Sequence, residues 1–250
     1  MLLEARIALA FLTILPLRLP DGLPAARLQR SAAFFPLAGW LIGVLLSAGA
    51  WLGKGLSGLP PQVAAMLLVA LAAWFTRGLH LDGVADLLDG LGGGHDPARR
   101  LAIMKDSSIG AFGVVGLVLL LGLKAVCLAA LLAAGEPRSW LWPLVAAPVA
   151  ARWAMAALAC GASYPRQAGT GHVFVGKVSG RELLLGGLFL LPLPLGGGVA
   201  VATMFAALLP AIWLRPKATA ALGGVTGDVL GAACELGEAA GWLAAVIALS

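Results

Sequence analysis

Charged residues are scarce in this sequence. Asp, Glu, Lys and Arg make up 12% of its 250 residues, whereas soluble globular domains contain about 25%. Hydrophobic residues make up 60%, and the mean hydropathy is +0.96. Too little polar surface remains to enclose a core in water, so the composition excludes an ordinary soluble domain and predicts an integral membrane protein.

Cysteine is scarce as well. The three cysteines, Cys127, Cys160 and Cys234, are isolated within apolar stretches. Their spacing excludes a disulfide framework and a cysteine-based metal site. We expect all three to serve only in packing.

The first 17 residues lack the features of a secretory signal. No basic residue precedes their apolar stretch, and Glu4 and Arg6 interrupt it. We expect an interfacial or re-entrant helix there instead.

Long uncharged runs dominate the rest of the chain. A bilayer-spanning helix needs about 20 residues, and several runs approach or exceed that length. Ala, Leu and Gly prevail without strict alternation, which argues against a strand barrel. The sequence therefore predicts an all-α, polytopic transmembrane helical bundle of six or seven spans with a short cytoplasmic helix. The runs are 31–53, 55–76, 107–123, 183–214 and 239–250, with 139–162 broken only by Arg152.

The basic residues predict the orientation of the bundle. Segments 18–30, 77–106, 163–182 and 214–227 hold 12 of the 17 Lys and Arg residues, and basic loops stay in the cytoplasm. All four lie there only if run 183–214 crosses twice, as a hairpin turning near 191–198. Two full crossings need about 40 residues, so short, tilted or re-entrant helices are required. We expect one integral membrane domain, 1–250, in the cytoplasmic membrane, with 77–108 as a cytoplasmic acidic connection.

Three aspartates form a regular pattern in that connection. Asp82, Asp86 and Asp89 stand at i, i+4 and i+7, on one face of a helix that continues the apolar run ending near Leu79. Acidic residues in a loop are usually only solvated. Like charges at this spacing repel, however, so helix stability does not call for the stripe. A bound cation would reverse that interaction, and we predict metal binding at Asp82 and Asp86.

A second acidic group opens the last apolar segment. Asp228 and Glu235 stand at i and i+7, and Glu238 lies off that face. Carboxylates at a membrane boundary are functional candidates, and oxygen ligands suit Mg²⁺. The alternative is structural: Asp228 caps the last helix, and Glu235 pairs with a basic residue such as Arg152.

Other residues near these acids suggest capping and phosphate binding. Asp96 and Pro97 predict the N-cap and first residue of a short helix over 97–106, followed by a small-residue stretch, 107–113, that allows backbone to approach a ligand. His80 is a candidate for holding a phosphate or orienting a carboxylate. Segment 171–178, GHVFVGKV, lacks the Ser or Thr of a P-loop, but Lys177 and the nearby Arg166 are candidates for a phosphate site.

Four motifs together resemble one enzyme family. RSAAFFPLAGWLIG (30–43), HLDGVADLLDGL (80–91), IMKDSSIGAFG (103–113) and GGVTGDVLGAACEL (223–236) are similar to those of the cobalamin synthases, the adenosylcobinamide-GDP ribazoletransferases. The resemblance covers 30–238 and implies a magnesium-dependent membrane enzyme. Its reaction would join adenosylcobinamide-GDP to α-ribazole, or to its 5′-phosphate, and release GMP.

The resemblance also implies roles for single residues. Mg²⁺ would be held by Asp82, Asp86 and Asp89, with Asp106 or Asp228 completing the site, and either Asp89 or Glu235 would take the hydroxyl proton. The substrate, chiefly its phosphates, would be bound by His80, Arg77, Lys105, Arg166 and Lys177. The expected partners are these small molecules and the lipid bilayer, not nucleic acid.

Two other functions share some of these features. A CDP-alcohol phosphotransferase also has helical spans, clustered aspartates and Mg²⁺, but its D-x-x-D-G-x-x-A-R motif is absent, because DGVADLLDG begins with Asp-Gly. A cation transporter would place its acids near mid-bilayer in repeated halves, whereas these acids are expected to gather at one face.

Overall fold

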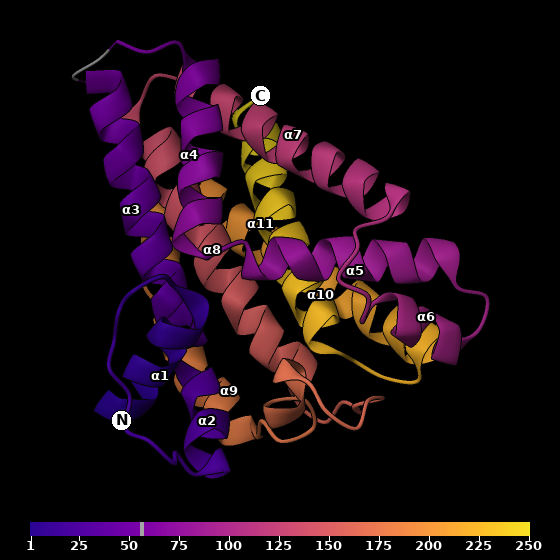
Figure 1. Cartoon of the computed structure of the whole chain (residues 1–250). Coiled ribbons are helices and arrows are strands. Elements are labelled where there is room, and N and C mark those ends of the chain that lie inside the picture. The colour runs from indigo at the N-terminus through magenta and orange to yellow at the C-terminus, as the bar shows by residue number, and fades with distance from the viewer. Residues whose placement is uncertain (56–57) are drawn as a thin grey trace.

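Helices form all the regular structure in the part of the chain that is described. The computed structural model describes residues 1–55 and 58–250, and no strand occurs within them (Figure 1). This confirms the all-α class. The α-helices are α1 (Leu2–Leu12), α2 (Ala25–Ser31), α3 (Phe35–Gly55), α4 (Pro61–Phe75), α5 (Leu79–Gly93), α6 (Pro97–Ile103), α7 (Ala111–Ala133), α8 (Pro137–Ala159), α9 (Gly180–Gly187), α10 (Gly197–Leu222) and α11 (Gly227–Leu249), and the 3₁₀ turns are η1 (Ala32–Phe34), η2 (Thr170–Val173), η3 (Leu188–Leu190) and η4 (Leu193–Gly196).

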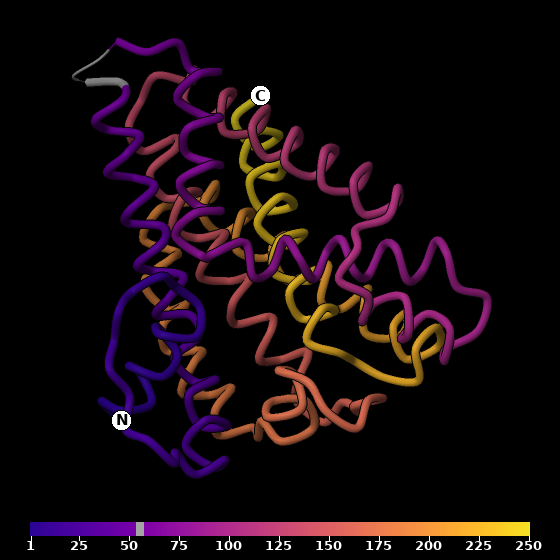
Figure 2. Tube along the Cα trace, in the orientation of Figure 1, coloured from indigo at the N-terminus to yellow at the C-terminus, as the bar shows by residue number. Residues whose placement is uncertain are grey.

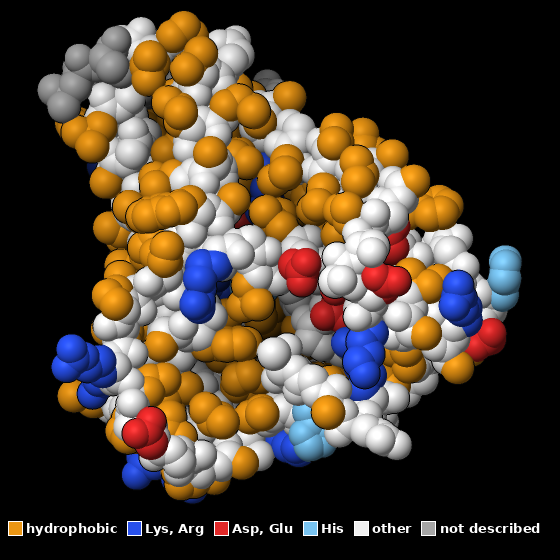
Figure 3. All heavy atoms as spheres, in the orientation of Figure 1, with side chains coloured by type: hydrophobic (Ala, Val, Ile, Leu, Met, Phe, Trp, Pro, Cys, Tyr) orange, Lys and Arg blue, Asp and Glu red, His pale blue; other side chains and the backbone are white. Residues whose placement is uncertain are grey.

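Several helices are long and apolar enough to cross a bilayer. Within the described residues there are five, 25–53, 111–133, 137–159, 180–222 and 227–249, or six if the bent pair α4 and α5 counts as one span. The polytopic helical bundle is therefore confirmed, and its five to six candidate spans reach at most the lower of the two predicted counts. On α7, Val118, Leu119 and Val126 are more than 60% exposed, as expected of side chains that face lipid. Hydrophobic side chains cover much of the visible surface (Figure 3).

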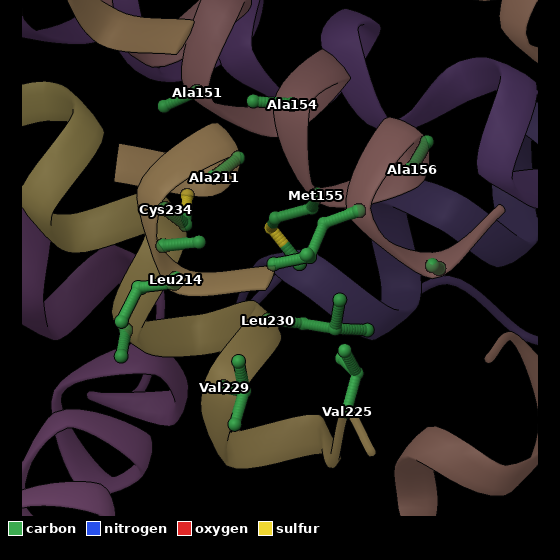
Figure 4. Packing of buried hydrophobic residues seen from close by; sticks show 14 of the residues in the cluster. Ala151, Ala154, Met155, Ala156, Ala211, Leu214, Val225, Val229, Leu230 and Cys234 are labelled. Atoms are coloured by element: carbon green, nitrogen blue, oxygen red, sulfur yellow. The ribbon is translucent and has the colours of Figure 1, made fainter. Parts of the chain in front are cut away.

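Helix α8 forms the centre of the bundle, and small residues let its neighbours approach closely. A Cβ atom on Gly39 of α3 would lie 2.6 Å from the Cα of Val149 on α8. Close approach through small residues is how membrane helices gain van der Waals contact. Figure 4 shows Met155 of α8 among buried side chains that include Leu230 and Cys234 of α11. All three cysteines are free, consistent with a packing role.

The apolar segment 180–222 doubles back on itself, as the sequence predicts. Near its start, the Leu183 carbonyl accepts a hydrogen bond from Trp153 (3.0 Å), close to the C-terminal end of α8. Gly196 instead packs against Trp142, close to the N-terminal end of α8. Gly197 then has φ +79, a conformation open to glycine, and α10 returns along the bundle (Figure 2). The first arm is short, with its helix α9 ending at Gly187.

The basic segments gather at one end of the bundle. The amide of Val225 donates to the Ser163 carbonyl (2.8 Å), and the Arg100 guanidinium donates to the Ala221 carbonyl (3.0 Å). Helix α2 contacts η2 at the same end. This arrangement confirms the predicted grouping of the four basic segments, and we call this the basic end.

A sharp turn separates α4 from α5. The two helices are bent by 92°, with Arg77 at φ +57 and Gly78 at φ +63. The Gly78 amide still bonds to the Ala73 carbonyl (2.9 Å), which closes the last turn of α4. The prediction that the acidic helix continues the preceding apolar run is therefore wrong: the left-handed pair makes α5 a new helix with its own direction.

Candidate functional site

The three aspartates of the stripe lie on α5, as predicted, but differ in burial. Asp82 is exposed, Asp86 is half-buried, and Asp89 is buried. The stripe therefore runs from solvent into the protein, so each carboxylate has a different environment.

Two glycines bring the stripe against the start of α11. A Cβ atom on Gly83 would lie 2.9 Å from the Cα of Asp228, and one on Gly231 would lie 3.1 Å from the Cα of His80. Any larger side chain at either position would push α5 and α11 apart. This crossing unites two acidic segments that are far apart in sequence. Electrostatic interactions link Asp228 with both Asp82 and Asp86.

Arg166 supplies positive charge to this group. Its guanidinium lies 2.8 Å from a carboxylate oxygen of Asp228 and also interacts electrostatically with Asp86. The helix cap is a different residue, because the Thr226 hydroxyl accepts a hydrogen bond from the Val229 amide (3.3 Å). The alternative that Asp228 caps the last helix is therefore wrong. We call Asp82, Asp86, Asp228 and Arg166 the carboxylate site.

A pocket of about 180 Å³ opens at the carboxylate site. Asp82, Asp228 and His80 line it together with apolar side chains. His80 is buried, and neither of its ring nitrogens has a hydrogen-bond partner among the described residues. A buried polar group without a partner is costly, so His80 remains a candidate for the role predicted for it. Acidic side chains border a hollow on this face (Figure 3).

Asp89 has a separate set of partners. Its two carboxylate oxygens accept hydrogen bonds from the amides of Gly110 (2.7 Å) and Gly113 (2.8 Å), at the start of α7. A Cβ atom on Gly110 would come within 2.5 Å of Asp89. The small-residue stretch 107–113 thus brings its backbone to a carboxylate of this chain, where the positive end of α7 favours negative charge.

Asp106 lies in a different pocket from Asp82 and Asp228. That pocket, of about 340 Å³, is lined by Asp89, Arg99, Asp106 and Ser108 among others. The Ser108 amide donates to Asp106 (2.9 Å), and this bonding lowers the pKa of the exposed Asp106 carboxyl. The residue therefore stays ionised but is not gathered into the carboxylate site.

Glu235 lies inside the bundle in a four-residue ion cluster. Lys124 of α7 bonds to Glu235 and also to Glu238 (2.7 Å), and Arg152 of α8 bonds to Glu238 (2.5 Å). All four side chains are buried. Arg152 is therefore part of the cluster, but the direct partner of Glu235 is Lys124. Sequence reasoning missed Lys124, although a lone Lys within an apolar 23-residue helix is itself a signal of a buried partner.

The remaining predicted phosphate ligands are dispersed. Arg77 donates to the Ala10 carbonyl (3.0 Å) and so connects the α4–α5 turn to α1. Lys177 lies 3.3 Å from a ring nitrogen of His172, and Lys105 is exposed beyond the end of α6. Of the basic candidates, Arg166 is the one with an ion pair to an aspartate of the carboxylate site.

The predicted cap before α6 is confirmed. Asp96 accepts a hydrogen bond from the Arg99 amide (2.9 Å), with Pro97 as the first helical residue. The helix ends at Ile103 instead of 106.

The donor chemistry of the carboxylate site fits Mg²⁺. Within residues 1–55 and 58–250, no three His, Cys, Asp or Glu side chains are placed to hold a metal ion by themselves. Mg²⁺ commonly takes only one or two carboxylates and completes its shell with water and substrate phosphates. Asp82, Asp86 and Asp228 supply carboxylate oxygens, and the three carboxylates outnumber the single neighbouring guanidinium, that of Arg166.

Comparison with known proteins identifies relatives along nearly the whole chain. Residues 4–246 match a family described as cobalamin-5-phosphate synthase. The chain is 42% identical to the adenosylcobinamide-GDP ribazoletransferase of Ectopseudomonas mendocina (strain ymp), over 99% of this chain and 100% of the relative. It is 43% identical to the enzyme of that name from Pseudomonas aeruginosa (strain UCBPP-PA14), over 94% of each. No solved structure matches the chain.

Proposed function

The chain belongs to the cobalamin-5-phosphate synthase family, and on this basis we propose that it joins adenosylcobinamide-GDP to α-ribazole or its 5′-phosphate and releases GMP. The transferase activity in cobalamin synthesis follows from the family and from the names of the relatives. The same membership sets aside the CDP-alcohol phosphotransferase and the cation transporter. We further propose that the reaction depends on Mg²⁺ and takes place at the cytoplasmic face of the inner membrane, where basic loops are retained.

The observation that supports this reaction is the crossing of α5 and α11. In the reaction a ribose hydroxyl forms a P–O bond to the phosphorus on the cobinamide side, and the P–O bond to GMP breaks. Two negatively charged phosphates resist the incoming oxygen. Mg²⁺ held by one or two of Asp82, Asp86 and Asp228, with water and substrate phosphates completing its shell, would neutralise charge on the phosphates and on the leaving GMP.

The chain's own side chains supply the other requirements. Arg166 adjoins both Asp228 and Asp86, and its planar guanidinium is suited to grip two phosphate oxygens. The two bases predicted from the sequence are engaged elsewhere, Asp89 by backbone amides and Glu235 by Lys124. We therefore propose that a carboxylate of the carboxylate site left outside the Mg²⁺ shell accepts the hydroxyl proton.

The test is GMP release by the purified protein from adenosylcobinamide-GDP and α-ribazole. We expect release that depends on both substrates, is abolished by EDTA and is restored by added Mg²⁺. Protein treated with EDTA and then returned to Mg²⁺ controls for irreversible damage. No release with either acceptor would refute the reaction, and undiminished release in EDTA would refute the dependence on Mg²⁺ alone.

A further inference from the structure

An apolar cavity adjoins the carboxylate site. It measures about 280 Å³ and lies between α1, α2 and η2, with Ile7, Ala10, Leu28 and Val173 among its lining residues. Thr170 alone among its described lining residues has a polar side chain. Ligand pockets begin at about 300 Å³, so this cavity suits one compact apolar group. We call it the apolar cavity.

The apolar cavity is next to the pocket of the carboxylate site. Phe11, Thr170 and Phe174 line both. The ring centroids of Phe11 and Phe174 are 5.4 Å apart, and Phe35 packs edge-on against Phe174 at 5.2 Å. Aromatic side chains therefore form a wall that the two pockets have in common. In Figure 3 a hollow with hydrophobic side chains adjoins the acidic ones on the face shown.

The apolar cavity also lies at the basic end of the bundle. Helix α2 and η2, which contribute to its lining, contact each other there. Arg77 fixes α1 beside the start of α5 through the Ala10 carbonyl. A solute that reaches the carboxylate site from the basic end therefore meets the cavity without first crossing the bundle.

We propose that the apolar cavity binds the aromatic base of the ribazole acceptor and so directs its ribose hydroxyl toward the carboxylate site. This inference rests on the proposed function and specifies how the acceptor is held. A ribazole combines a flat, apolar benzimidazole base with a polar ribose, and the two adjoining pockets differ in the same way. Aromatic rings gain from edge-to-face and offset contacts with phenylalanines.

The other parts of the two substrates fit the apolar cavity poorly. Guanine carries several polar edge groups, which an apolar lining would leave without partners at a cost. A corrin ring system is far larger than one compact group. A lipid acyl chain remains the competing occupant, and the experiment distinguishes it from the base.

The test fills the apolar cavity by substituting Ala10 with leucine. We expect Ala10→Leu to raise the KM for α-ribazole about tenfold or more, because one extra methylene in an apolar pocket changes selectivity by about 10- to 200-fold. The KM for adenosylcobinamide-GDP should change less than twofold. The matched control is Ala26→Leu, the same substitution at an exposed position of α2, which should leave both constants unchanged.

Direct binding gives a second measurement that does not depend on turnover. Titration calorimetry of α-ribazole into the purified protein should show weaker binding to Ala10→Leu than to wild type and the Ala26→Leu control. Leu28→Ala, which enlarges the cavity, serves as a second variant if Ala10→Leu does not fold. It should also weaken the binding of α-ribazole without weakening that of adenosylcobinamide-GDP.

The outcomes separate this inference from the proposed function. Wild-type protein that releases no GMP would refute the function itself. Active protein whose folded cavity variants keep the wild-type KM and affinity for α-ribazole would refute the cavity as the base site and favour a lipid occupant. Equal changes in the KM of both substrates would refute it as well.

Discussion

Two charged regions to which α11 contributes illustrate how different surroundings give carboxylates different environments. At the carboxylate site three aspartates adjoin one guanidinium and a pocket. In the ion cluster, Glu235 and Glu238 face Lys124 and Arg152, and all four are buried. The first region has excess negative charge that an external cation can neutralise, whereas the second is already neutral. The comparison therefore predicts ligand binding at the first region and a contribution to stability from the second.

The largest expected effect comes from unbalancing the ion cluster. Lys124→Met should lower the free energy of unfolding by about 3–5 kcal/mol, because removing one partner leaves buried charge uncompensated. The measurement is the thermal unfolding midpoint of the purified protein in detergent. Adding Glu235→Gln to Lys124→Met should recover part of the loss. Stability unaffected by Lys124→Met would mean that the cluster does not hold the bundle together.

Removing charge from the carboxylate site should lower activity and leave stability nearly unchanged. Asp82→Asn or Asp86→Asn should reduce GMP release about 100- to 1,000-fold, since metal stabilisation of charge is worth several kcal/mol. The unfolding midpoint should barely change, because Asp82 is exposed and Asp86 only half-buried. Asp21→Asn, an exposed acid remote in sequence from the motif, is the matched control. Near-wild-type release by both site variants would exclude them as metal ligands.

Two substitutions on α11, Glu235→Gln and Asp228→Asn, compare the ion cluster with the carboxylate site directly. Glutamine keeps the shape but leaves Lys124 with one fewer charged partner, so we expect a loss of about 1–3 kcal/mol of stability. The turnover of the protein that remains folded should be close to wild type. Asp228→Asn, seven residues earlier on α11, should instead lower turnover and keep stability. Turnover lost in Glu235→Gln without a change in stability would restore Glu235 as a catalytic candidate.

The smallest effect is expected at a third ionic contact, near the N-terminus. The Met1 amino group and Arg27 hold the pKa of Glu4 at about 2, below its ordinary value of 4.5. Because this pKa is lowered on folding, the stabilisation is complete above about pH 4.5 and is lost as the pH falls toward 2. Glu4→Gln should cost about 1 kcal/mol or less. The difference in unfolding midpoint between wild type and variant should shrink between pH 6 and pH 3, and a constant difference would contradict the assignment.

Local patterns in the sequence predicted the features that depend on neighbours along the chain. The Asp96-Pro97 pair fixed the start of α6, and the spacing of Asp82, Asp86 and Asp89 placed them on one helix. The turn of the hairpin followed from segment 191–198, rich in proline and glycine. In each case the physical cause is a cap, a period or a turn residue within a few positions.

The features that were missed depend on contacts between distant segments. Gly78 is a local signal for the end of α4, but Arg77 before it also adopts a left-handed conformation, which is uncommon for a residue other than glycine, so the 92° bend was not predicted. Asp89 meets the amides of Gly110 and Gly113 only because α7 starts beside α5. The pairing of Glu235 with Lys124 depends on how α7 packs against α11, and no spacing within one helix reports that.

The hairpin 180–222 has a consequence for how the chain enters the membrane during synthesis. Its turn, residues 188–199, contains no charged residue, and both of its flanks lie at the basic end. The translocation machinery would therefore move no charge through the hydrocarbon when the two arms insert, and a central Asp, Lys or Arg would otherwise cost about 2.5–3.5 kcal/mol. The pair of arms is suited to partition into lipid as one unit once both arms have been synthesised, with the two basic flanks left together on one side of the membrane.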